Sequence, residues 1–95
     1  MSRSQDMALT VAEFFRHLPH ALDGYETYRV DDATVAAESP GRHVTIRATP
    51  LEPRRLGPIL VLPRTLVTLE FDGFTDDEVR EFLGRFDRAF QRGGG

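Results

Sequence analysis

Residues 72–90 read DGFTDDEVREFLGRFDRAF, and this stretch carries the clearest structural signal in the chain. Thr75 and Glu78 have the spacing of a capping box, in which each side chain accepts a hydrogen bond from the other residue's backbone N–H. Apolar residues then recur at helical spacing, namely Val79, Phe82, Leu83, Phe86 and Phe90. The stretch therefore predicts an amphipathic helix that begins after Thr75 and buries one face.

The same pattern recurs near the amino terminus. Thr10 and Glu13 fit a second capping box, and an apolar stripe follows at Val11, Phe14, Phe15 and Leu18. Pro19 disfavours helix at the residue before it, so this helix is expected to end or bend near Leu18. The polar residues 1–7 are expected to be disordered, and the glycines at 93–95 to form a flexible tail.

Between the two predicted helices the apolar period changes to two. Val44, Ile46 and Ala48 alternate with polar residues, which is typical of a strand with one buried face. Strand-like runs also occupy 25–37, 59–62 and 66–71, and Ser39-Pro40-Gly41-Arg42 is a turn sequence. Pro50 is expected to end the central strand, and residues 52–57 to form a basic loop.

The resulting order, α-β-β-β(-β)-α, predicts an α+β fold. We expect an antiparallel sheet of three or four strands with both helices packed on one face. Ninety-five residues without an internal linker or repeat predict a single domain spanning residues 1–95.

Composition argues against several classes of function. The chain has no cysteine, no apolar run of membrane-spanning length and no secretory-type hydrophobic segment, which predicts a cytoplasmic protein with no membrane partner. No serine is placed as an activated nucleophile. His17 and His20, even with Asp23 or His43, lack a recognised metal-ligand spacing. We therefore expect no catalytic residues, no metal and no cofactor.

The leading functional hypothesis comes from the apolar run at 59–62. Successive strand residues face opposite sides, so Leu60, Leu62 and Leu66 are predicted to lie on the face away from the helices. Exposed apolar side chains of this kind predict a non-catalytic protein-interaction module that uses the sheet surface or edge. We expect a homodimer, and a different protein partner is the other occupant that would cover these side chains. The alternative is that a loop, or a bend at Pro63, buries these leucines within one chain.

Charge suggests a second hypothesis. Residues 42–64 carry only one acid, Glu52, and five arginines, namely Arg42, Arg47, Arg54, Arg55 and Arg64, whereas the flanking segments are acidic. Such a segment is a candidate for binding an anionic ligand or RNA. The order helix, three strands, helix resembles the topology of double-stranded RNA-binding domains. Those domains present lysines at the start of the second helix, where Asp76, Asp77 and Glu78 stand here, so nucleic acid is the less favoured partner.

A third hypothesis concerns the carboxyl terminus. The last glycines resemble the termini of ubiquitin-like proteins and sulfur carriers, which implies a carrier role for Gly95. Here the tail follows a helix, and a helix cap with a flexible end explains the same residues.

Overall fold

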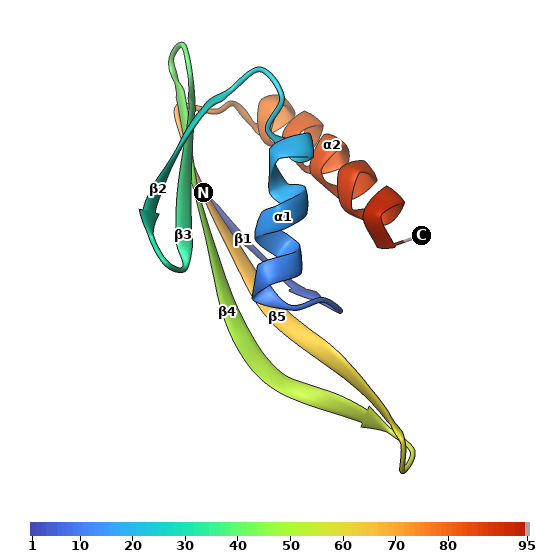
Figure 1. The fold of residues 1–95 in the computed structure, drawn as a ribbon. Coiled ribbons are helices and arrows are strands. Elements are labelled where there is room, and N and C mark those ends of the chain that lie inside the picture. The colour runs from blue at the N-terminus through green and yellow to red at the C-terminus, as the bar shows by residue number, and fades with distance from the viewer. Residues whose placement is uncertain (95) are drawn as a thin grey trace.

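The computed structural model describes residues 1–94, with side-chain surroundings for residues 1–91. It contains five strands and two helices (Figure 1): β1 (Ser2–Met7), α1 (Val11–Ala21), β2 (Glu26–Asp31), β3 (Thr34–Ser39), β4 (Arg42–Leu56), β5 (Leu60–Asp72) and α2 (Asp76–Gly94). The strands form one antiparallel sheet in the order β1-β5-β4-β3-β2. The α+β class and the antiparallel sheet are confirmed, but the number of strands and the element order differ from the prediction.

The additional strand is β1, at the segment expected to be disordered. Ser2 pairs with Glu70 and Met7 pairs with Thr65 along the outer edge of β5. The N–H of Phe71 also donates to the carbonyl of Met1 at 2.8 Å. Backbone hydrogen bonds order most of this strand, and only Met7 packs against the core, so its hydropathy carries little sign of a strand.

The core lies between the helices and the sheet, and it includes the β4 residues that the alternating pattern predicted to be buried. β4 contributes Val44, Ile46 and Ala48, and β5 contributes Val67, Leu69 and Phe71. The helices supply the phenylalanines, and the rings of Phe14 and Phe90 stack with centroids 5.1 Å apart. Burying each such side chain contributes roughly 1.5–3 kcal/mol, so this layer stabilises the fold.

Both capping boxes form. The hydroxyl of Thr10 accepts from the N–H of Glu13 at 3.0 Å, and the carboxylate of Glu13 accepts from the N–H of Thr10 at 2.9 Å. Thr75 and Glu78 make the equivalent bonds at 3.2 and 2.9 Å. The helix α1 continues through Pro19 to Ala21, beyond the expected end near Leu18.

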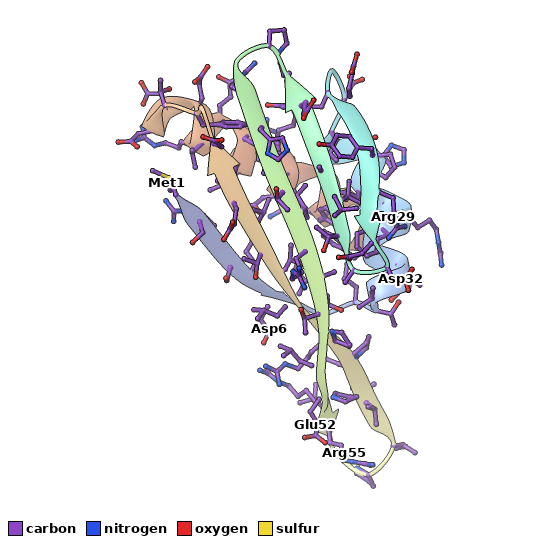
Figure 2. The ribbon with its side chains drawn as sticks, turned by 90° about the vertical axis from the view of Figure 1, so that its left-hand side faces the viewer. Met1, Asp6, Arg29, Asp32, Glu52 and Arg55 are labelled. Atoms are coloured by element: carbon purple, nitrogen blue, oxygen red, sulfur yellow. The ribbon has the colours of Figure 1, made fainter. Side chains whose placement is uncertain are left out.

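The hairpin of β4 and β5 continues past the rest of the sheet. The pairing of β3 with β4 begins at Thr34 and Arg47, and β1 ends opposite Thr65. Beyond those pairs the two strands run on alone and project from the sheet (Figures 1 and 2). We call residues 52–64 the arm. Residues 52–57, expected to be a loop, mostly form the end of β4, with a register shift between Leu51 and Arg54.

Candidate functional site

Pro50 lies within β4 at the base of the arm. It does not interrupt the strand, because position 50 faces an open edge. The N–H of Ala48 donates to the carbonyl of Ala33 at 2.9 Å, toward the β3 side of β4. Successive N–H groups of an antiparallel strand point to alternate sides, so position 50 faces the same side as Ala48, beyond the point where β3 begins. Pro50 therefore removes no hydrogen bond from the β4–β5 ladder.

The same reasoning explains Pro63 in β5. The N–H of Phe71 points toward β1, and the alternation carries this direction through Thr65 to position 63. Pro63 thus faces the outer edge of the arm, past the end of β1. Pro50 and Pro63 each remove a donor that a neighbouring strand would need, one on each edge at the base of the arm, which disfavours edge-to-edge pairing there.

Aliphatic side chains are concentrated on the arm. Ile59, at its tip, is 93% exposed, and Leu60 is 51% exposed. Leu56 and Val61 are also exposed, and Leu62 is half-buried. The bend at Pro63 does not enclose Leu60. Leu66, the third predicted partner-binding residue, is half-buried below the arm, opposite Thr49 and Asp6.

The strand register sorts the arm's side chains onto two faces. Leu56 pairs with Leu60 and Arg54 pairs with Leu62, so these residues share one face. Arg55 and Val61 pair on the other face. Beyond the base of the arm, where Asp6 and Ala8 lie beside Leu62, no third element within residues 1–94 covers either face. An isolated two-stranded ribbon is at best marginally stable in water. The arm therefore combines apolar exposure with weak internal support.

An ion pair ties the base of the arm to β1. The guanidinium of Arg64 donates to one carboxylate oxygen of Asp6 at 2.6 and 3.0 Å, and to the carbonyl of Glu52 at 3.3 Å. These bonds to the charged carboxylate hold the pKa of Asp6 below its ordinary value. Arg54 lines a shallow hollow of about 220 Å³ beside this pair, together with Leu62 and Pro63.

The structure divides the five predicted anion-binding arginines. Arg54, Arg55 and Arg64 lie on the arm, and Arg47 lies farther along β4. Arg42 is at the opposite end of β4, about 40 Å from Arg54 at the usual rise per residue. Its guanidinium is 3.5 Å from Glu78 and lies over the ring of Phe74. The five arginines therefore do not converge on one surface.

A second hollow, of about 330 Å³, lies at the end of the sheet near Arg42. Two arginines and three acids line it around the ring of Tyr25, namely Arg42, Arg85, Asp23, Glu78 and Glu81. Both arginines already have a partner within the chain, since Arg42 is close to Glu78 and Arg85 donates to the carbonyl of Asp23. This arrangement contains no nucleophile paired with a base.

Two further features bear on the class of site. Within residues 1–94, no three acidic or histidine side chains gather in a way that would hold a metal ion. Neither helix of the described chain combines the length and the apolar character needed to cross a membrane. The carrier role predicted for Gly95 concerns a residue outside those that the structure describes.

The chain was also compared with known proteins. No protein-family model, curated protein or solved structure matches it.

The sequence missed one feature of this site. It indicated apolar exposure at Leu60 and Leu62, but not that they stand on a projecting ribbon with Leu56. The sequence does contain a signal for the tip of a hairpin. Aliphatic residues, Leu56 and Ile59, flank Gly57-Pro58, and this pattern is typical of a tight turn between two strands.

Proposed function

We propose that this chain is a non-catalytic protein-interaction module that forms a homodimer through the arm and the adjoining sheet surface. The observation that supports the proposal is the set of exposed aliphatic side chains on the arm, with Leu56 and Leu60 on one face, Val61 on the other and Ile59 at the tip. Monomeric proteins rarely leave such a set of side chains in water, and contiguous apolar patches mark interaction sites.

Charge favours a second copy as the partner. The arm carries three arginines and Glu52, a net charge of +2, in a chain whose formal net charge is -3. The remainder of the chain therefore carries -5, and an arm that meets another copy meets surface of opposite sign. Complementary charge speeds encounter and sets the register of an interface, while apolar contact supplies the affinity.

The test is the molar mass in solution. Sedimentation velocity at tens of micromolar should give twice the chain mass of 10.7 kDa. Leu60→Asp with Leu62→Asp should give a monomer with unchanged far-ultraviolet circular dichroism, because these side chains lie outside the core. A wild-type chain that stays monomeric at hundreds of micromolar removes the proposal.

A matched control separates a local effect from a change in net charge. Arg80→Gln with Arg88→Gln lowers the net charge by the same two units on the exposed side of α2. This control should remain dimeric. If it dissociates as the leucine variant does, overall charge and not the arm governs association.

The cytoplasm is the compartment we propose for this module, on the basis of its cysteine-free composition. Binding of RNA or another polyanion by Arg54 and Arg55 is the alternative partner chemistry. That alternative predicts association with heparin that weakens steeply with salt, whereas apolar dimerisation persists at high salt.

A further inference from the structure

Strand β2 is the other part of the molecule with exposed apolar side chains. All six of its residues are exposed, and Tyr28 and Val30 are 49% and 56% accessible. Among the described residues, the only other large exposed apolar side chain outside the arm is Met1. β2 pairs with β3 on one side and is the last strand of the sheet, so its other edge is open.

The charge of this edge is opposite to that of the arm. Glu26, Asp31 and Asp32 are acidic, and Arg29 is the only base between residues 26 and 32, which leaves a net charge of -2. The guanidinium of Arg29 lies 4.4 Å from the centre of the Phe15 ring and donates to the carbonyl of Asp32. Arg29 therefore turns toward α1, and the acids dominate the edge.

The position and length of β2 also match those of the arm. Figure 2 shows Arg29 and Asp32 at the end of the sheet from which the arm, with Glu52 and Arg55, projects. Six residues of β2 span about 20 Å at the usual rise per residue, and each strand of the arm spans a similar length. Two copies placed with their arms antiparallel would bring each arm tip toward the β2 end of the other.

We infer that the β2 edge, Glu26 to Asp32, is the surface that receives the arm of a second copy. This inference rests on the proposed homodimer and specifies its contacts. Leu56, Ile59 and Leu60 of one copy cover Tyr28 and Val30 of the other, and Arg54, which shares a face with Leu56 and Leu60, lies against Asp32. A two-fold axis generates the contact twice, as in an isologous interface. Because prolines disfavour strand pairing at the base of the arm, side chains make the contact and not an added strand.

A charge-exchange experiment tests the inference. Arg54→Glu places an acid on the contacting face of the arm, and Asp32→Arg places a base on the edge, so each variant alone should weaken its own dimer by roughly tenfold or more in Kd. When the two variants are mixed, the substituted arm of one variant meets the substituted edge of the other. The second arm–edge contact of the same dimer is wild type on both sides. The mixture should therefore form a heterodimer of near wild-type affinity. Asp31 is left unchanged, since its carboxylate accepts from the N–H of Ala33 and shapes the turn.

Val30→Asp supplies a second, apolar test. It should weaken association as Leu60→Asp does, with the fold checked by circular dichroism. Arg88→Glu is the matched control, because it reverses a charge on α2, away from both surfaces, and leaves β2 unchanged. It should leave Kd unchanged.

The outcomes separate the two proposals. A wild-type monomer overturns both. A wild-type dimer that Leu60→Asp with Leu62→Asp dissociates, but that Asp32→Arg and Val30→Asp leave intact, overturns the β2 site alone. Failure of the mixed variants to recover affinity also overturns it, because charge pairing between these two surfaces requires that recovery.

Discussion

The two halves of the β4–β5 hairpin share one ladder and have opposite surroundings. In the body, Val44, Ile46 and Leu69 alternate with polar residues and are completely buried beneath the helices. In the arm, Leu56, Ile59 and Leu60 belong to the same hairpin and meet water. Hydrogen bonding is available to both halves, so the difference comes from the second layer. Strand pairing shapes a ribbon, whereas burial against helices stabilises it.

The largest expected contrast is between buried and projecting apolar residues. Phe86 is fully buried, and its ring centroid lies 4.8 Å from that of Phe90. Phe86→Ala should lower the free energy of unfolding by roughly 3–5 kcal/mol. Ile59→Ala should lower it by less than about 0.5 kcal/mol, and any further loss should depend on protein concentration. Urea denaturation at two concentrations measures both, and equal losses would contradict this division of the hairpin.

A pair of glycines tests the same contrast through the backbone. Gly73 and Gly57 both have positive φ, at 79° and 86°. A Cβ at Gly73 would collide with the carbonyl oxygen of Gly41, whereas at Gly57 it would meet open space. Gly73→Ala should therefore destabilise by roughly 2–4 kcal/mol, combining strain and overlap. Gly57→Ala should destabilise by about 1–2 kcal/mol from strain alone. Thermal unfolding distinguishes them, and a similar loss for both would contradict the close packing of the two turns.

Local capping should account for a smaller part of the body's stability. Thr75→Ala removes the hydroxyl that accepts from the N–H of Glu78, and should lower the free energy of unfolding by about 1 kcal/mol. Thr75→Ser keeps an acceptor oxygen and is the matched control. Chemical denaturation measures the change in the free energy of unfolding. A loss as large as that of Phe86→Ala would show that capping, and not the core, limits stability.

The smallest effect is expected at the ion pair below the arm. Because Arg64 lowers the pKa of Asp6 in the folded chain, this carboxylate stabilises the fold above its ordinary pKa. That contribution is lost as the pH falls through the lowered folded value. Arg64→Gln should raise the pKa of Asp6 toward its ordinary value of about 3.9. Carboxyl NMR titration measures the change, and an unaltered pKa in the variant would show that the pair does not form in solution.

Local chemistry made parts of this fold predictable. The start of each helix can be predicted from its capping box, Thr10 with Glu13 and Thr75 with Glu78, because a capping box involves residues only three apart. The alternation of Val44, Ile46 and Ala48 likewise identifies the buried face of β4. Dimerisation through Leu60, Leu62 and Leu66 stays a prediction, although the structure leaves Leu60 accessible and Leu62 and Leu66 half-buried.

What the sequence by itself determined is therefore the pair of amphipathic helices, the apolar alternation and the α+β class, since each depends on neighbours a few residues apart. Only the tertiary structure decided that Ser2–Met7 becomes a strand, because its backbone is ordered by the edge of β5, between 58 and 68 residues away in sequence. It also decided that Pro50 and Pro63 lie inside long strands. A proline ends a strand only where its missing N–H faces a partner, and which edge has a partner depends on where β1 and β3 stop.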